Sequence, residues 1–370
     1  MMQTLTAILA LLATSCAADK AQPTIDTDEG NATLAERSCS PGSNTGYLWL
    51  NGVNIAGFEF GTDTNGYADL SRAYPPTGGD NPNGYGQVQH FFSSRNMNAF
   101  RYPVSWQYLI NSNTASTDIN MAHFGNYNGL IQQCLKLSPN TRCIVDIHNY
   151  GRFEGNVLSS SDPWFSNFWA SLAGMWKDDP NRDRIIFELM NEPHDIDMDG
   201  WTALQQEAVI KIRNTMGTNN NIILLSGTDW THASNWVNLN TGLAEIKNPG
   251  GEQYQNLLFT VHDYFQGDNA DPNAACDGTL QSTSSDLACW LRQNERQAMF
   301  TEIGGGRNCV GACMSSLHWL AQNSDVFIGY TAWAAGSFDT SYIMSATPDP
   351  DWSDRTMVRL CYQNGPQYNS

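Results

Sequence analysis

Three observations in the sequence predict an α/β protein folded as a closed (β/α)8 barrel, also called a TIM barrel, in a single domain. Eight short apolar runs recur at intervals of roughly forty residues. Most of the segments between these runs are long enough for a helix, and several are amphipathic. Most runs end in polar or aromatic residues. Because the carboxyl ends of all strands in such a barrel lie on one face, these residues should meet.

The expected strands and helices alternate along the chain. The strands are the runs 48–55, 99–104, 142–148, 185–191, 221–226, 257–262, 297–302 and 327–333. The clearest helices are the segments 84–98, 127–138, 162–178, 198–217 and 279–295. An open doubly wound sheet would show the same alternation. No glycine-rich phosphate turn follows the first run, which disfavours the nucleotide-binding form of that sheet.

The first 18 residues have the pattern of a secretory signal peptide. Their apolar stretch, residues 5–13, is too short to span a bilayer and is followed by small residues suited to cleavage near Ala17 or Ala18. The alternative is a bacterial lipoprotein signal with Cys16 as the lipidated residue. Either signal predicts export, and we expect a secreted, extracellular protein.

Residues 19–40 are polar and lack hydrophobic periodicity, which predicts a flexible leader. The leader contains the sequon at Asn31, which would be glycosylated only in a eukaryotic host. Residues 41–370 are then left for one large domain, the barrel itself. No later segment is long and apolar enough to cross a membrane.

The composition excludes several classes of partner. A net charge of −18 and a pI near 4.5 argue against nucleic acid and against anionic membranes, which need a basic surface. A neutral substrate fits this charge better. The 12 Trp and 14 Tyr residues exceed the usual needs of a core, and some of these rings are expected to form platforms for sugar rings or other flat ligands.

The cysteines indicate disulfide bridges. Eight remain after removal of Cys16 with the signal, and an even number in an exported chain is typical of disulfides. Metal binding is the alternative, but the only close pair, Cys309 and Cys313, has no second pair or histidine cluster at ligand spacing.

Chemically useful residues stand at the ends of six of the expected strands. They are Arg101, His148, Asn191, Glu192, His262, Tyr264, Glu302 and Trp333. The two glutamates would face each other across the barrel mouth, and paired carboxylates of this kind cleave glycosidic bonds. One must be protonated to donate to the leaving oxygen, and the other must stay ionised. Arg101 and Tyr264 are expected to favour the charged form of Glu302.

Other polar and aromatic residues are expected to be structural. Asp146 and Glu188 lie inside strand runs and should be hydrogen-bonded groups of the barrel interior. A structural or surface position is also expected for the remaining histidines, which are His90, His123, His194, His232 and His318. Core packing is expected for three tryptophans on one predicted helix, which are Trp164, Trp169 and Trp176.

Several stretches together resemble one enzyme family. They are "LNGVNIAGFEFG", "FRYPVSWQYL", "CIVDIHNYGRFEG", "MNEPHD", "VHDYF", "LRQNERQAMFTEIGGG" and "GYTAWAAGSFD". In this order, from residue 48 to residue 339, they are similar to the secreted endo-β-1,4-glucanases of glycoside hydrolase family 5, particularly the fungal-type cellulase subgroup. The resemblance implies hydrolysis of internal β-1,4-glucosidic bonds with retention of configuration.

The resemblance also assigns roles to the strand-end residues. Glu192 would be the acid/base and Glu302 the nucleophile, with their carboxyl groups about 5 to 5.5 Å apart. Arg101 would hold Glu302, and Asn191 would bind the 2-hydroxyl of the sugar at the cleavage point. His148, His262 and Tyr264 would complete that shell, with Trp333 as its floor and a cis peptide after it. Trp230 would be a platform on the leaving-group side, or a packed residue.

The resemblance further implies the bridges Cys134–Cys143, Cys276–Cys309 and Cys313–Cys361, which leaves Cys39 and Cys289 as the last pair. The cellulose-binding module and linker of many relatives are absent from the sequence, so soluble or amorphous β-glucans are the expected substrates of a monomeric enzyme. No metal or organic cofactor is expected, because two carboxylates complete the chemistry. A β-mannanase, a xyloglucanase and a non-catalytic glycan-binding protein are the alternatives.

Overall fold

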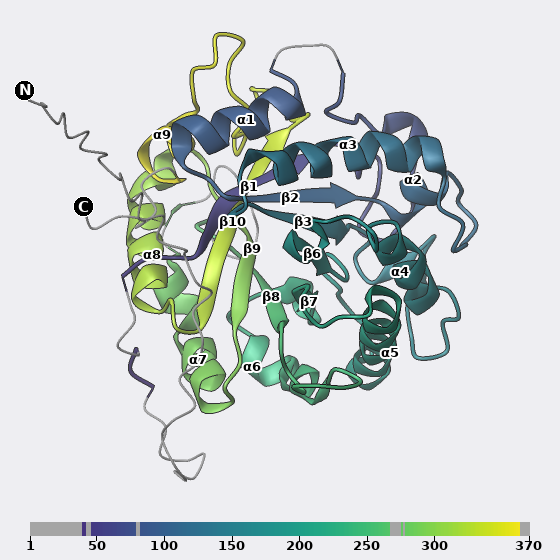
Figure 1. Cartoon of the computed structure of the whole chain (residues 1–370). Coiled ribbons are helices and arrows are strands. Elements are labelled where there is room, and N and C mark those ends of the chain that lie inside the picture. Colours follow the sequence, from purple (N-terminus) through teal and green to yellow (C-terminus); the bar gives the residue numbers. More distant parts are fainter. Residues whose placement is uncertain (1–38, 42–45, 79–81, 267–274, 277, 363–370) are drawn as a thin grey trace, which may run out of the picture.

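A computed structural model describes residues 39–41, 46–78, 82–266, 275–276 and 278–362. Eight parallel strands close into a barrel in the order β1-β10-β9-β8-β7-β6-β3-β2, with helices around them (Figure 1). The strands are β1 (Leu50–Ala56), β2 (Ala99–Val104), β3 (Arg142–Ile147), β6 (Ile185–Glu188), β7 (Ile223–Leu225), β8 (Leu257–Tyr264), β9 (Ala298–Gly304) and β10 (Phe327–Gly336). The predicted (β/α)8 barrel is confirmed.

Helices follow most strands. The longer ones are α1 (Gly84–Arg95), α3 (Met121–Leu137), α4 (Phe165–Gly174), α5 (Met198–Met216), α7 (Leu280–Gln293) and α8 (Val310–Gln322). The short ones are α2 (Trp106–Ile110), α6 (Trp236–Leu239) and α9 (Thr356–Leu360). A hairpin of β4 (Arg152–Phe153) and β5 (Asn156–Val157) stands in the loop after β3. All five predicted helices are present, and α8 was not among them.

The fourth barrel strand is shorter than its apolar run. The sequence predicted a strand to Asn191, but β6 ends at Glu188, so Asn191 and Glu192 belong to the loop that follows. The chain nevertheless keeps to the barrel wall over this stretch. The Leu189 N–H donates to the Leu224 carbonyl at 3.1 Å, and the Asn191 N–H donates to the Ile147 carbonyl at 2.8 Å. These bonds hold the start of the loop at the barrel mouth.

The barrel interior has two layers. Ten buried apolar residues form a separate cluster: Trp49, Leu50, Ala99, Ile144, Ile186, Ile222, Leu224, Leu258, Met299 and Ile328. Alternate residues of a strand face the same side, so the residue two positions further along a strand also faces inward. Two positions beyond Ala99, Ile144 and Ile186 stand the charged residues Arg101, Asp146 and Glu188, all fully buried. The apolar base thus gives way to a charged layer nearer the mouth.

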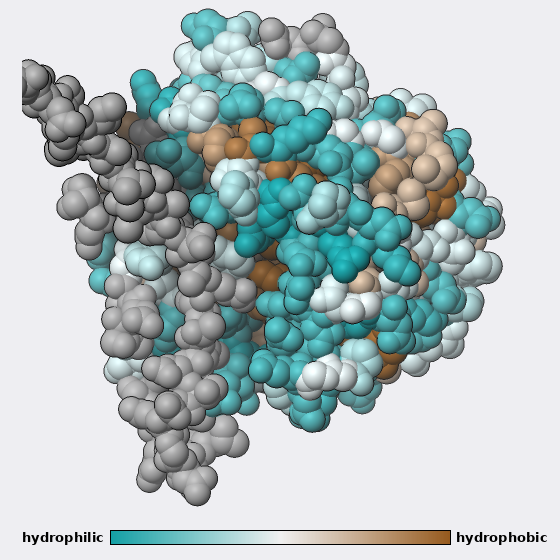
Figure 2. Space-filling model, in the orientation of Figure 1, coloured by the Kyte–Doolittle hydropathy of each residue, from teal (hydrophilic) through white to brown (hydrophobic). Residues whose placement is uncertain are grey.

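A larger apolar core lies between the barrel and the helices. Trp169 and Trp176 belong to it, as predicted, and the Trp169 indole N–H donates to the Leu189 carbonyl at 3.0 Å. The prediction for Trp164 is wrong, because this residue precedes α4 and is 43 % exposed. The outer surface is mainly hydrophilic on the face in Figure 2, as expected for helices that turn their apolar side to the barrel.

Four disulfides join the pairs expected from the sequence: Cys39–Cys289, Cys134–Cys143, Cys276–Cys309 and Cys313–Cys361. The first ties residue 39 to α7, and the last ties α8 to the segment after α9. None of the helices in the described ranges is both long and apolar enough to cross a bilayer. The predicted signal peptide, the leader up to residue 38, Cys16 and Asn31 lie outside the described residues.

Candidate active site

The eight strand-end residues converge at the barrel mouth. Arg101 lies in β2, His262 and Tyr264 in β8, Glu302 in β9 and Trp333 in β10; His148 follows β3, and Asn191 and Glu192 follow β6. All except Glu192, Tyr264 and Trp333 are buried, and these three are partly exposed. Residues far apart in the sequence therefore meet in one place.

Arg101 is the centre of the charged layer. Its guanidinium contacts side-chain oxygens of five residues: Asn54 Oδ1 at 2.9 Å, Asp146 Oδ2 at 3.0 Å, Glu188 Oε2 at 2.6 Å and Oε1 at 3.2 Å, Asn191 Oδ1 at 2.9 Å and Glu302 Oε1 at 2.7 Å. Burial tends to lower the pKa of Arg101, but the surrounding carboxylates raise it well above its usual value. Burial tends to raise the pKa of Glu188, but Arg101 lowers it to about 2. The predicted interior roles of Asp146 and Glu188 agree with these contacts.

Glu302 is held on both carboxylate oxygens. Arg101 Nη1 bonds Oε1 at 2.7 Å, and the Tyr264 hydroxyl donates to Oε2 at 2.5 Å. Burial and the nearby glutamates raise the pKa of Tyr264 well above its usual value, so it remains a donor. Gly304, the neighbour of Tyr264 across β8 and β9, makes room for the ring, because a Cβ there would lie 2.8 Å from Tyr264 Cε1.

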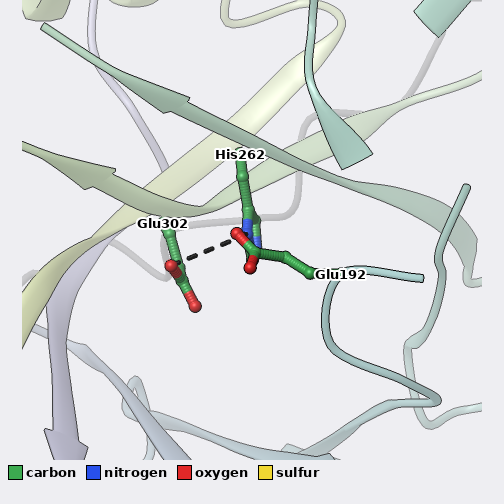
Figure 3. Close-up of side chains that lie close together, drawn as sticks. All are labelled: Glu192, His262 and Glu302. Atoms are coloured by element: carbon green, nitrogen blue, oxygen red, sulfur yellow. Dashed lines mark hydrogen bonds and ion pairs between the residues drawn. The ribbon is translucent and has the colours of Figure 1, made fainter. Parts of the chain in front are cut away.

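Glu192 approaches from the opposite side. Its backbone φ is 41°, a left-handed conformation that is uncommon for a non-glycine residue and that often occurs at functional sites. His262 Nδ1 lies 2.8 Å from Oε1 of Glu192, whose side chain is 16 % exposed. Figure 3 shows Glu192 and Glu302 converging beside His262. One oxygen of each carboxylate and one ring nitrogen of His262 all lie within 4.8 Å of one another.

The carboxylates around His262 favour its cationic form, in which both ring nitrogens carry a hydrogen. Burial tends to lower its pKa, but the carboxylates of Glu302, Glu188 and Glu192 raise it to about 10. Nδ1 then donates to Glu192, and Nε2 donates to Thr301 Oγ1 at 2.9 Å. Burial tends to raise the pKa of Glu192, but the bond and charge of His262 outweigh burial and lower it. The contacts of Glu192 therefore favour its charged form, whereas glycosidase chemistry needs one of the two carboxyl groups protonated.

His148 and Trp333 form one wall of the site. Their rings stack with centroids 5.5 Å apart and an angle of 13° between planes. Burial and Arg101 lower the pKa of His148. The neutral ring donates from Nδ1 to Asp146 Oδ2 at 2.7 Å, which leaves the lone pair on Nε2 for another donor. The peptide between Trp333 and Ala334 is cis, as expected from the family resemblance.

The side-chain amide of Asn191 has one donor group, Nδ2, without a partner among the described residues. Its Oδ1 atom accepts from Arg101, and Nδ2 is buried. A buried amide without a partner costs free energy, so a ligand hydroxyl that accepts from Nδ2 would be favoured.

Comparison with known proteins shows the family of the chain. The model of the family "Cellulase (glycosyl hydrolase family 5)" matches residues 52–338. The chain belongs to glycosyl hydrolase family 5. It is 40 % identical over 326 residues to Endoglucanase EG-II of Hypocrea jecorina, covering 84 % of this chain and 76 % of that protein. It is 32 % identical over 316 residues to Manganese dependent endoglucanase Eg5A of Phanerodontia chrysosporium, covering 83 % and 78 %.

A solved structure agrees with this assignment. The crystal structure of Cel5A (EG2) from Hypocrea jecorina superimposes with a TM-score of 0.79 at 39 % identity, covering 85 % of this chain and 98 % of that one. The predicted family, fold and glycoside hydrolase class are therefore confirmed. Glu192 and Glu302 both lie within the matched family segment.

Close to Glu192, Trp230 lies in an unusual turn. Asp229, Trp230 and Thr231 have φ values of 57°, 60° and 58°, three successive left-handed residues. The Trp230 ring stacks on His194, with centroids 3.9 Å apart. The Trp230 N–H donates to the Pro193 carbonyl at 3.0 Å, which places it next to Glu192. Trp230 is partly exposed and also packed on His194, so its role as a platform on the leaving-group side stays a prediction.

Two residues of this site were not predicted, and a third has a structural role, as expected. The third is His194, whose buried ring stacks on Trp230. Tyr150 packs edge-on against both His148 and Trp230, at 5.3 and 6.1 Å between centroids. Asn54 bonds Arg101 and two backbone carbonyls. Only Asn54 left a signal in the sequence, because it is a polar residue inside an apolar strand.

Proposed function

We propose that the protein is a secreted, monomeric endo-β-1,4-glucanase that hydrolyses internal bonds of cellulose or mixed-linkage β-glucan with retention of configuration. The observation that carries this proposal is the short separation of Glu192 and Glu302, whose nearest oxygens lie within 4.8 Å. A retaining pair stands about 5 to 5.5 Å apart, whereas an inverting pair stands about 6.5 to 9.5 Å apart to admit a water molecule. The endoglucanase names of the relatives support the substrate class.

In the first step, a carboxylate oxygen of Glu302 attacks the anomeric carbon and the glycosidic C–O bond breaks. Glu192 donates a proton to the leaving oxygen, and His262 Nδ1, 2.8 Å away, supplies that proton to Glu192. Arg101 and Tyr264 fix the orientation of Glu302. Asn191 Nδ2 is free to donate to the 2-hydroxyl of the same sugar. The product of this step is a glycosyl ester on Glu302.

In the second step, a water molecule attacks the anomeric carbon from the side that the leaving group vacated. Glu192 takes one proton from that water, and the ester bond to Glu302 breaks. The ester carries no negative charge, so His262 loses part of the attraction that raises its pKa. Two displacements at one carbon restore the original configuration.

The decisive experiment follows new reducing ends released from carboxymethyl cellulose, together with the anomeric form of the first product by NMR. We expect a β-configured first product from the wild-type enzyme and no release by Glu302→Ala. The matched control is Glu207→Ala, a partly exposed glutamate on α5 that pairs with Lys211 away from the site, which should keep full activity. An α-configured first product would show that the retaining assignment is wrong.

The barrel and the carboxylate pair do not determine the glycan. Parallel assays on mannan, xyloglucan and barley glucan distinguish a glucanase from a mannanase or a xyloglucanase. Oligosaccharide binding without any hydrolysis, from acidic to neutral pH, would instead indicate a glycan-binding protein.

The manganese in the name of one relative calls for a separate test. Glu192, His262 and Glu302 could together offer three ligand atoms to an ion. An ion there would replace the proton between His262 and Glu192 and occupy both carboxylates. We therefore expect EDTA to leave hydrolysis unchanged. Loss of activity in EDTA, restored by Mn²⁺, would contradict the metal-free mechanism.

A further inference from the structure

A cavity of about 340 Å³ lies beside Trp333. Its lining includes Glu59, Phe60, Arg72, His148 and Phe338. Aromatic rings form much of its wall, with centroids 4.9 Å apart for Phe60 and Phe338 and 5.7 Å apart for Trp333 and Phe338. Flat rings beside a few polar groups are the usual lining of a sugar-binding cavity.

The position of the cavity shows which part of a glucan it could hold. Trp230 is bonded to Pro193, the neighbour of the acid/base candidate Glu192, and so lies on the leaving-group side. The cavity extends from Trp333 toward Phe60 and Phe338, in the loops that follow β1 and β10. It therefore lies on the other side of the cleavage point, where the sugar that precedes the cleaved unit would bind.

Glu59 is the one acidic residue among the residues that line this cavity. It is only 5 % exposed. Its Oε2 atom accepts from the Gly57 N–H at 2.7 Å, whereas its buried Oε1 has no partner within the described ranges. Burial raises the pKa of Glu59 to about 7. In an acidic medium the carboxyl is neutral, and it can both donate and accept a hydrogen bond.

We propose that Glu59 is a specificity-determining residue whose Oε1 atom hydrogen-bonds a hydroxyl group of the second glucosyl unit on the non-reducing side of the cleavage point. This inference rests on the proposed glucanase function. An unpaired carboxyl oxygen costs free energy in the empty enzyme, and a sugar hydroxyl would satisfy it. A chain whose second sugar lacks that hydroxyl would leave Glu59 unpaired and would be discriminated against.

The test combines altered substrates with altered enzymes. The substrates are aryl β-cellobiosides in which the non-reducing glucose lacks one hydroxyl, at position 2, 3 or 6. The enzymes are wild type, Glu59→Ala and Glu59→Gln, with Glu252→Ala at an exposed position as the matched control. Glutamine can keep the bond to the Gly57 N–H, so the second variant separates loss of the sugar contact from distortion of the loop.

One deoxy substrate should lose about tenfold in kcat/KM with wild type, the effect of leaving one buried polar group unpaired. With Glu59→Ala the parent substrate should lose a similar factor, mainly through KM, and the penalty for that deoxy substrate should disappear. Glu59→Gln should lie between, and Glu252→Ala should match wild type.

An unchanged penalty for all three deoxy substrates in Glu59→Ala would overturn the proposal, and so would a parent substrate that the variants hydrolyse as fast as wild type. Absence of hydrolysis by the wild-type enzyme itself would instead show that the glucanase function is wrong. The two failures are therefore distinguishable.

Discussion

The two layers of the barrel interior differ in chemistry although the same strands build them. The base is the apolar cluster that includes Ala99, Ile144 and Ile186. The charged layer, two residues further along these strands, is made by Arg101, Asp146 and Glu188. Along each strand, one inward-facing residue packs in the apolar base and the next inward-facing residue forms ion pairs. One end of a barrel strand can therefore stabilise the fold while the other end carries catalytic residues.

The two layers should also differ in energetics. Burial of apolar side chains in the base favours folding, by roughly 1.5 to 3 kcal/mol for each large residue. Burial of charges costs free energy, and the network around Arg101 recovers it only while every partner is present. Substitutions in the base should therefore change stability alone. Substitutions in the charged layer should change activity, and they should also lower stability where they leave a buried charge without its partner.

The largest expected effect is loss of catalysis at the mouth. Glu302→Gln keeps the size of the side chain but removes the nucleophile, so kcat on an aryl cellobioside should fall by roughly 10⁴-fold or more. The melting temperature should stay close to that of wild type. The control is Glu207→Gln on the surface of α5. If Glu302→Gln retained a tenth of the activity, Glu302 could not be the nucleophile.

The next effect tests the network itself. Arg101→Met leaves buried carboxylates without their cation, so the free energy of unfolding should fall by about 3 to 5 kcal/mol, measured by urea denaturation. Activity should fall as well, because Glu302 and Asn191 lose a partner. A variant as stable as wild type would mean that Arg101 does not compensate these carboxylates.

A substitution in the base should separate the two properties. Leu224 is fully buried in the apolar cluster. Leu224→Ala should therefore lower the free energy of unfolding by about 2 to 5 kcal/mol through a cavity. The kcat of the folded enzyme, measured well below its melting temperature, should stay within about twofold of wild type. A large drop in kcat at full folding would show that the two layers are coupled.

The sequence predicted the barrel and the convergence of the candidate site residues because both depend on strand order. Glu302 lies near the carboxyl end of β9 and Glu192 follows β6, and a parallel barrel brings such positions together whatever their separation along the chain. The raised pKa of His262 could not be predicted, since it depends on three carboxylates that converge only after folding. The stack of His194 on Trp230 depends on a left-handed turn at residues 229–231, and the residue types in that turn do not predict it.

Glu59 differs from Glu302 at the barrel mouth, because neither of its carboxyl oxygens bonds Arg101. Burial raises its pKa from 4.5 to about 7, so between these pH values the folded protein binds more protons at this site than the unfolded chain does. Protonation of Glu59 therefore adds to the free energy of unfolding. This contribution, about 3 kcal/mol, is fully present below pH 4.5 and is lost as the pH rises through 7. Glu59→Gln does not titrate, so its free energy of unfolding should depend less on pH in this range than that of wild type, while Glu252→Gln should follow wild type. Equal slopes for wild type and Glu59→Gln would mean that Glu59 is ionised at low pH, and that the mouth holds a compensating charge for this carboxylate as it does for Glu302.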